Sequence, residues 1–208
     1  MSGAVSGKRP FVLGLTGSVG MGKSTVAKFF AEAGVPVHDS DAVVHALYDG
    51  EAAPAIERAF PGTTSGGKVD RAKLAARVLN DRSAFERLEA IVHPLVSAAT
   101  ERFLAEAAAR GEPVVVLDVP LLFETAGERR CDAVVVVSAP SGVQRDRVMA
   151  RAGMTEEKLA AILGRQMSDA EKRRRADFVV DNSKDFEHVR AQVRDILDAV
   201  AKMRAEQH

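Results

Sequence analysis

One eight-residue segment constrains this chain more than any other feature. Residues Gly17–Ser24 read GSVGMGKS and match the phosphate-loop pattern G-x-x-x-x-G-K-[ST] without a gap. The apolar run Phe11–Thr16 precedes the segment and predicts a buried strand, and helical spacing follows from Ser24 to Ala33. Glycines let successive backbone N–H groups turn towards phosphate oxygens, and the N-terminus of a helix adds its positive dipole end. The sequence therefore predicts a strand–loop–helix unit that binds a nucleotide.

The side chains of this loop suit ATP in particular roles. Lys23 is positioned to bridge the β- and γ-phosphates as a catalytic residue, and the Ser24 hydroxyl to ligate Mg²⁺. A GTP switch is disfavoured, because no aspartate is followed three residues later by glycine and Asn182–Asp185 reads NSKD in place of N-K-x-D. The residues expected to contact ATP in this loop are Gly17, Gly20, Met21, Gly22, Lys23, Ser24 and Thr25.

The alternation of strand and helix patterns predicts an α/β fold of the P-loop NTPase type, with a doubly wound five-stranded parallel sheet. After the first strand, further strands are predicted at 35–38, 114–119, 133–137 and 178–180. Helices are predicted at 24–33, 141–151, 155–176 and 185–203. Residues 41–110 are Ala-rich and predict helices without a strand.

This order of elements predicts one domain over residues 10–206. Its core comprises 10–40, 111–143 and 177–206. The stretch 41–110 is too long for a simple crossover, so we interpret it as a helical insertion that binds the phosphate acceptor. Residues 144–176 are interpreted as a helical lid.

Two carboxylates follow the second predicted strand. Asp39 and Asp41 are two residues apart, so one can hold Mg²⁺ through water while the other takes the proton of an attacking hydroxyl. We assign Asp41 as the general base and Asp39 as the partner on the metal side. The alternative is that one of them caps the following helix, a role that aspartate performs well.

The third predicted strand ends at Asp118, where nucleotide-binding folds often place an acid near Mg²⁺. Four apolar residues before an aspartate are common, so this role stays open. The next segment, Pro120–Glu124, reads PLLFE and forms either an apolar wall for a ligand or ordinary packing.

The predicted lid is basic, with nine Lys and Arg residues against five acids between Gln144 and Arg175. Arg147 and Arg151 are spaced i, i+4 and are expected to share one helix face, from which they would act on the transferring phosphoryl group. The run Lys172–Arg175 is interpreted as a solvated helix surface.

Composition limits the remaining classes. Lys and Arg total 29 and Asp and Glu total 29, so no net charge favours a nucleic-acid or membrane-surface partner. No apolar stretch approaches the roughly 18 residues of a membrane span. The single Cys131 fits a reducing compartment and a small buried apolar role. We expect a soluble cytoplasmic protein, and interpret His93, before Pro94, as a residue at a helix start.

Taken together, these residues resemble the dephospho-coenzyme A kinases. The resemblance extends from Leu13 to Asn182. It rests on the phosphate loop with Thr16, on Asp39 and Asp41, on Val69-Asp70-Arg71 with Leu74, on Leu88-Glu89 and His93-Pro94, on Pro120–Glu124, on Arg147 with Arg151, and on Ala176-Asp177 to Asn182.

The resemblance implies transfer of the ATP γ-phosphate to the ribose 3′-hydroxyl of dephospho-CoA, the last step of coenzyme A synthesis. It implies that the insertion binds the CoA moiety, that Asp41 is the base and that Asn182 contacts the nucleotide. The expected partners are ATP and dephospho-CoA, with the chain a monomer or small homo-oligomer. A shikimate-type kinase also has an Asp-x-Asp after its second strand, and a P-loop ATPase without acceptor is a further alternative.

Overall fold

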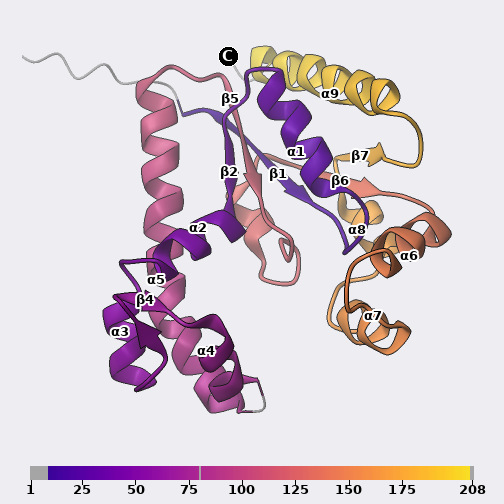
Figure 1. Cartoon of the computed structure of the whole chain (residues 1–208). Coiled ribbons are helices and arrows are strands. Elements are labelled where there is room, and N and C mark those ends of the chain that lie inside the picture. Colours follow the sequence, from indigo (N-terminus) through magenta and orange to yellow (C-terminus); the bar gives the residue numbers. More distant parts are fainter. Residues whose placement is uncertain (1–8, 80, 207–208) are drawn as a thin grey trace, which may run out of the picture. The chain divides into compact units, whose positions relative to one another are not determined.

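The computed structural model describes residues 9–79 and 81–206, which fold into two compact units (Figure 1). The first unit contains the chain up to His38 and from Ala107 onward. The second unit is Asp39–Glu106. The phosphate loop belongs to the first unit.

The main sheet has five strands in the order β2-β5-β1-β6-β7, and the registers of β1 with β5, β1 with β6 and β6 with β7 are parallel. All six residues of β1 are buried, as expected for a central strand covered on both faces. This confirms the predicted five-stranded sheet. The strands are β1 (Phe11–Thr16), β2 (Val37–Asp39), β5 (Val114–Asp118), β6 (Ala133–Ser138) and β7 (Phe178–Asp181).

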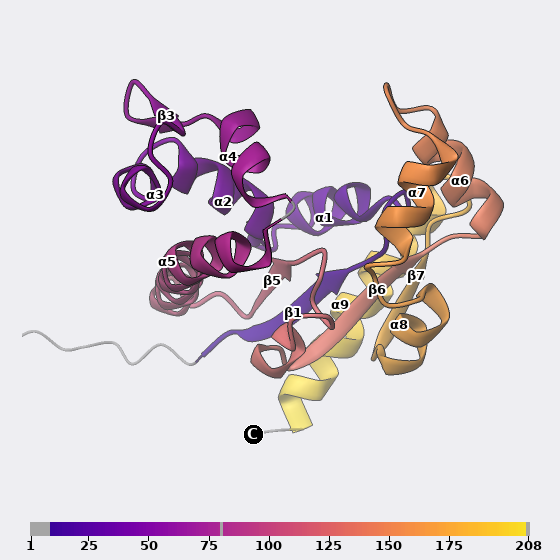
Figure 2. The ribbon, with the colours of Figure 1, turned by 90° about the horizontal axis from the view of Figure 1, so that it is seen from below.

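The helices of the first unit confirm the predicted order with shifted ends, and Figure 2 shows α6, α7 and α8 grouped on the β7 side of the sheet. The helical region predicted at 155–176 is two helices separated by a linker. The helices are α1 (Lys23–Glu32), α6 (Ser141–Met149), α7 (Glu156–Leu163), α8 (Asp169–Arg175) and α9 (Phe186–Glu206), with a short 3-10 turn at Gly127–Arg130.

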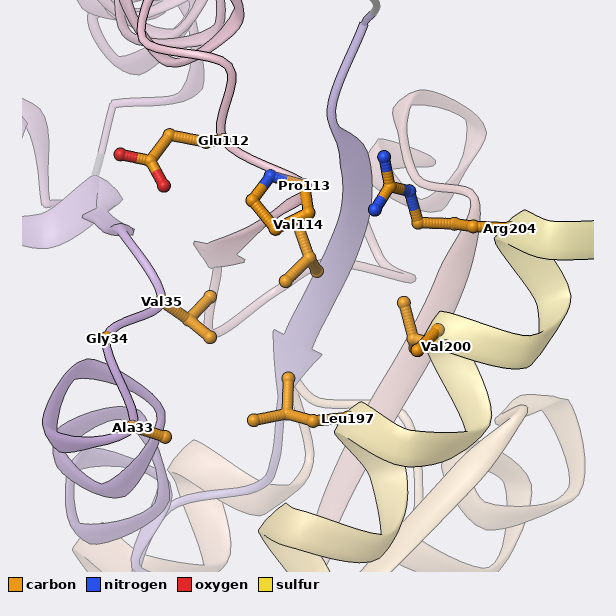
Figure 3. Close-up of a pocket in the computed structure, with 10 residues that line it drawn as sticks. Ala33, Gly34, Val35, Glu112, Pro113, Val114, Leu197, Val200 and Arg204 are labelled. Carbon is orange, nitrogen blue, oxygen red and sulfur yellow. The ribbon is translucent and has the colours of Figure 1, made fainter.

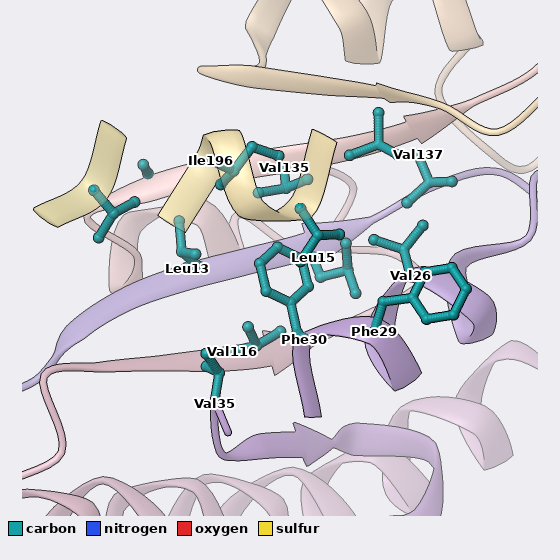
Figure 4. Packing of buried hydrophobic residues seen from close by; sticks show 14 of the residues in the cluster. Leu13, Leu15, Val26, Phe29, Phe30, Val35, Val116, Val135, Val137 and Ile196 are labelled. Carbon is teal, nitrogen blue, oxygen red and sulfur yellow. The ribbon is translucent and has the colours of Figure 1, made fainter. Parts of the chain in front are cut away.

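One face of the sheet packs against α1 and α9 (Figure 4). Alternate residues of β1, among them Leu13 and Leu15, contact Phe30 of α1 and Ile196 of α9 in this apolar cluster. Alternation places every second side chain of a strand on the same face, so the phosphate loop begins at the end of a strand fixed by packing.

The opposite face of β1 depends on a glycine. An ideal Cβ added to Gly14 would lie 2.7 Å from Leu122 Cδ2 and 2.8 Å from Cys131 Sγ. Cys131 is half-buried, and burial, followed by the nearby carboxylates of Asp132 and Glu128, raises the pKa of its thiol to about 12. The thiol therefore stays protonated and packs as a small apolar group, although it is less buried than expected.

The second unit has its own core, which includes Leu47, Ile56, Phe60 and Leu74. Its helices are α2 (Ser40–Tyr48), α3 (Ala53–Ala59), α4 (Arg71–Val78) and α5 (Arg82–Ala109) as far as Glu106.

Two expectations for this unit are wrong. Residues 41–110 do contain strands, because β3 (Thr64–Ser65) and β4 (Lys68–Val69) form an antiparallel hairpin. Gly66 and Gly67, at φ 58° and 78°, supply the left-handed turn that a two-residue hairpin loop requires.

His93 is not at a helix start, since α5 continues through Pro94. Proline removes one helical hydrogen bond. Leu88 and Ile91 before the proline and Leu95 after it all pack on the core of the second unit. This apolar stripe extends on both sides of the proline and keeps the helix continuous.

An apolar cavity of about 260 Å³ lies beside the start of β5 (Figure 3). Val114, Leu197 and Val200 line it, with Arg204 at its rim. Val114 begins β5 whereas Asp118 ends it, so this cavity lies at the sheet edge away from the phosphate loop.

Among the described residues no helix has the length and apolarity to cross a bilayer.

We predict that Gly14→Ala lowers the free energy of unfolding by about 1–3 kcal/mol, because the new methyl group overpacks Leu122 and Cys131. Gly142→Ala is the matched control, since nothing lies within 4 Å of its added Cβ. Denaturant unfolding measures both. Equal stability of the two variants would contradict the packing described for β1.

Candidate active site

The phosphate loop joins β1 to α1 and needs its glycines for two reasons. Gly20 and Gly22 have φ of 80° and 86°, in the left-handed region that favours glycine. A Cβ on Gly22 would also lie only 1.9 Å from Asn182 Nδ2. Gly22 caps α1, so the loop delivers the chain directly into the helix N-terminus.

Asn182 fastens the loop to the end of β7. Its side chain is buried, at 4% exposure for the residue, and its Nδ2 donates to the Met21 carbonyl at 2.8 Å. Arg147 donates from a guanidinium nitrogen to the Asn182 carbonyl, also at 2.8 Å. Three predicted site residues, Met21, Arg147 and Asn182, are therefore brought into one hydrogen-bonded group.

Lys23, the first residue of α1, forms an ion pair with Asp118 at the end of β5. Both side chains are largely buried, at 16% and 5% exposure. The pairing places the ammonium group at the carboxyl edge of the sheet, where ligands of α/β folds bind. Asp118, left open by the sequence, thus lies beside the loop and contacts its lysine.

Arg147 and Arg151 do not share a helix face as predicted. Helix α6 ends at Met149, and Arg151 lies in the turn that follows, where its N–H donates to the Val148 carbonyl. Arg151 is exposed, whereas Arg147 is half-buried beside Asn182. The i, i+4 spacing of the two arginines suggested a helix through residue 151. The helix ends earlier, and the chain turns at Gly153, which has φ 73°.

Asp39 ends β2 and caps α2, the alternative that the sequence left open. Its Oδ1 accepts the N–H groups of Asp41 and Ala42, at 2.9 and 3.0 Å. Asp41 is exposed in the first turn of α2.

The interpretation of Lys172 as a solvated residue is wrong. Its side chain has 0% exposure and forms an ion pair with Glu124 Oε1 at 2.9 Å. Arg173, Arg174 and Arg175 are exposed, as expected for a helix surface. A run of four basic residues must turn one member towards the sheet, and the sequence run by itself does not indicate which.

Glu124 is shared between two partners. Besides Lys172, its Oε1 accepts the Met167 N–H at 2.8 Å. Burial by itself raises the pKa of the Glu124 carboxyl, but the bonds from Lys172 and Met167 together outweigh burial, so the pKa lies below its ordinary value of 4.5. Glu124 is therefore a charged structural link between the loop after β5 and α8.

The segment Pro120–Glu124 is mostly packing. Leu122 and Phe123 are buried against Val134 and Val136 of β6. Leu121 is 40% exposed. Of the two alternatives left open, ordinary packing therefore holds for Leu122 and Phe123.

Sequence reasoning missed two glutamines that contact the loop. Gln144 donates to the Val19 carbonyl at 2.8 Å, and Gln166 accepts the Val19 N–H at 3.2 Å. A polar hollow of about 390 Å³ also opens at the ends of β6 and β7, with Ser138 and Asp169 in its wall. Isolated glutamines in helical patterns carry no spacing signal, so only the tertiary contacts identify them.

Comparison with known proteins decides the family. The family model described as dephospho-CoA kinase matches residues 11–188. A dephospho-CoA kinase of Rhodopseudomonas palustris (strain BisB18) is 66% identical over 92% of this chain and 96% of its own length. The chain belongs to the dephospho-CoA kinase family.

Solved structures share the fold of this chain. The structure of TT1252 from Thermus thermophilus is 38% identical, with a TM-score of 0.79 over 92% of this chain and 98% of that one. The dephospho-CoA kinase of Campylobacter jejuni is 23% identical, with a TM-score of 0.66 over the same shares, and shows the likeness of fold. As a dephospho-CoA kinase, the chain is an ATP-dependent enzyme, which excludes the shikimate-type and acceptor-free alternatives.

We predict that Glu124→Gln lowers the free energy of unfolding of this kinase by about 3 kcal/mol, because it leaves the Lys172 ammonium buried without its counter-charge. Adding Lys172→Met in the same chain should recover most of that loss. Denaturant unfolding of both single variants and the double variant measures the coupling. Additive losses would contradict a buried pair.

We predict a second consequence for pH. Because the folded pKa of Glu124 is depressed, its contribution to stability is full above the ordinary pKa of 4.5 and is lost as pH falls through the lower folded value. Between pH 6 and about pH 3, stability should therefore fall less steeply for the Glu124→Gln/Lys172→Met double variant than for the parent. Parallel slopes, measured by unfolding across that range, would contradict it.

Proposed function

We propose that the phosphate loop holds ATP, that Lys23 stabilises the transferring γ-phosphoryl group, and that Asp41 deprotonates the ribose 3′-hydroxyl of dephospho-CoA. The observation that carries the proposal is the Lys23–Asp118 pair at the carboxyl edge of the sheet. It presents an ammonium group beside left-handed glycines whose loop opens into the N-terminus of α1. Phosphoryl transfer needs positive charge held in place more than it needs covalent chemistry.

Mg²⁺ fits the oxygen donors at this edge. Mg²⁺ is commonly held by one or two protein oxygens together with phosphates and water. Ser24 is exposed, follows Lys23 in the first turn of α1, and is the residue that would hold the ion. The Asp118 carboxylate lies near the same turn, because it pairs with Lys23. Held there, Mg²⁺ would supply positive charge that offsets the negative charge of the phosphates. The metal role of Asp39 stays a prediction. One of its carboxylate oxygens accepts the capping bonds of α2, so only the other oxygen would be free to face the metal.

Asp41 is proposed as the base on chemical grounds. It is exposed and therefore accessible to an acceptor, and the family's activity requires the removal of a hydroxyl proton. Its neighbour Asp39 takes the capping bonds of α2, which leaves the Asp41 carboxylate free of that duty.

Arginines complete the proposed site. The half-buried Arg147 contacts Asn182 beside the loop, and we propose that it acts on the transferring phosphoryl group. Arg151, exposed in the turn after α6, is proposed to act on the γ-phosphoryl group from the lid, residues 144–176. We further propose that residues 41–110 bind the CoA moiety, that the enzyme works in the cytoplasm, and that it is a monomer or small homo-oligomer without a nucleic-acid partner.

We predict that Asp41→Asn lowers kcat by about 10²-fold, the usual scale for loss of a general base, while the affinity for ATP is retained. Steady-state ADP release with dephospho-CoA measures kcat. Asp49→Asn, an exposed aspartate at the other end of α2, is the matched control and should turn over normally. Normal turnover by the Asp41 variant would remove this residue from the mechanism.

Asp39→Asn separates the two duties of Asp39. Asparagine caps helices as well as aspartate does, so α2 is kept while the charge is lost. A raised Mg²⁺ requirement in this variant would support the metal role, and an unchanged requirement would leave Asp39 as a cap alone.

A further inference from the structure

The loop residue Val19 is held at both of its backbone polar groups by side chains from outside the loop. Gln144 of α6 donates to its carbonyl at 2.8 Å, and its N–H donates to Gln166 Oε1 at 3.2 Å. Val19 lies between the buried residues Ser18 and Gly20. Two side chains therefore fix the orientation of the two peptide units on either side of Val19 in the phosphate loop.

The two glutamines have different settings. Gln144 is buried inside α6 and is fixed by that helix. Gln166 lies in the linker 164–168 between α7 and α8, where its own N–H donates to the Leu163 carbonyl at 3.1 Å in the turn that ends α7. The position of Gln166 is therefore set by this turn on one side and by what holds the linker on the other.

The linker is anchored on its C-terminal side by the buried ion pair. Met167, adjacent to Gln166, donates its N–H to Glu124 Oε1 at 2.8 Å, and the same oxygen pairs with Lys172 at 2.9 Å. Ser168 then caps α8 by accepting the Glu171 N–H at 3.2 Å. The backbone at Met167, one residue from Gln166, is thus held by the buried Glu124 carboxylate.

That anchor returns to the strand that feeds the loop. Lys172 Nζ donates to the Pro120 carbonyl at 3.4 Å, and the Thr16 hydroxyl donates to the same carbonyl at 3.0 Å. Thr16 is the last residue of β1, directly before Gly17. A continuous series of contacts therefore starts at the end of β1 and passes through the Pro120 carbonyl, Lys172 and Glu124 to the linker. From there Gln166 returns to Val19 in the phosphate loop.

We infer that Gln166 is a positioning residue for phosphoryl transfer, which holds the Val19 amide of the phosphate loop while the Glu124–Lys172 pair holds the linker that carries it. The inference rests on the proposed function, in which this loop binds the ATP phosphates. Gln166 acts on the nucleotide through the loop backbone and is not a catalytic residue.

The physical reason is preorganisation. A phosphate loop binds through N–H groups that must point inward before the nucleotide arrives, and any loop that has to be ordered on binding loses affinity. Releasing the Val19 N–H would let this peptide rotate and would free the linker from the loop. Both effects weaken ATP binding and leave the acceptor's binding unchanged.

Gln166→Leu tests the inference, because leucine nearly keeps the volume and removes the acceptor. We expect about a tenfold weaker Kd for a non-hydrolysable ATP analogue by calorimetry, and a matching rise in KM for ATP, the scale of one hydrogen bond with its ordering. KM for dephospho-CoA should stay within about twofold. Gln166→Ser, which is too short to reach Val19, should give the same loss if leucine disturbs folding.

Glu156→Ala is the matched control. It breaks the exposed ion pair between Arg145 of α6 and Glu156 of α7, a contact in the same region that does not touch the phosphate loop. We expect the parent's affinity for the ATP analogue in this variant. Equal weakening in Glu156→Ala would show a general effect of the α6–α8 region and overturn the inference.

The remaining outcomes are also decisive. Parent-like affinity for the ATP analogue in both Gln166 variants would overturn the inference while leaving the proposed function intact. Failure of the parent enzyme itself to bind the analogue would overturn the proposed function. An equal rise in KM for both substrates would point to a structural defect and count against positioning.

Discussion

The ion pair between Lys23 and Asp118 is the interaction on which the site depends. It joins the first residue of α1 to the last residue of β5, across the end of β1. A largely buried ammonium group needs a counter-charge, and the counter-charge here is a carboxylate fixed by the sheet. The strands are held in register by apolar packing on both faces. The precision of the phosphate loop therefore derives from the core beneath it.

A second buried ion pair serves the other side of the loop. Lys172 and Glu124 connect α8 to the segment that follows β5, and their shared contacts reach Met167 and the Pro120 carbonyl. Such pairs add little net stability compared with apolar packing, but they fix one arrangement among many. In this kinase that arrangement brings the linker between α7 and α8 onto the phosphate loop. The geometry on this side of the phosphate loop is thus set by a few buried charges.

Family membership and local geometry answer different questions. The relatives establish a dephospho-CoA kinase, so the acceptor and the donor follow from the family. The geometry adds how the loop is held: Asn182 fastens it from β7, and two glutamines fasten Val19. These supports lie outside the loop motif, and they belong to elements far from it in sequence. The phosphate-loop motif is common to many nucleotide-binding proteins, whereas the contacts that hold it here come from other parts of this chain.

The sequence by itself determined the parallel sheet and the phosphate loop. Apolar runs such as Phe11–Thr16 have few alternatives to a buried strand, and the loop glycines suit left-handed turns that other residues avoid. Only the tertiary structure decided that Lys172 is buried, that Arg151 lies beyond the end of α6, and that α5 continues through Pro94. The burial of Lys172 and the continuity of α5 depend on which neighbours their side chains meet across the fold. Local patterns carry no information about such neighbours, because charge and apolar contacts between distant segments override helix spacing and propensity.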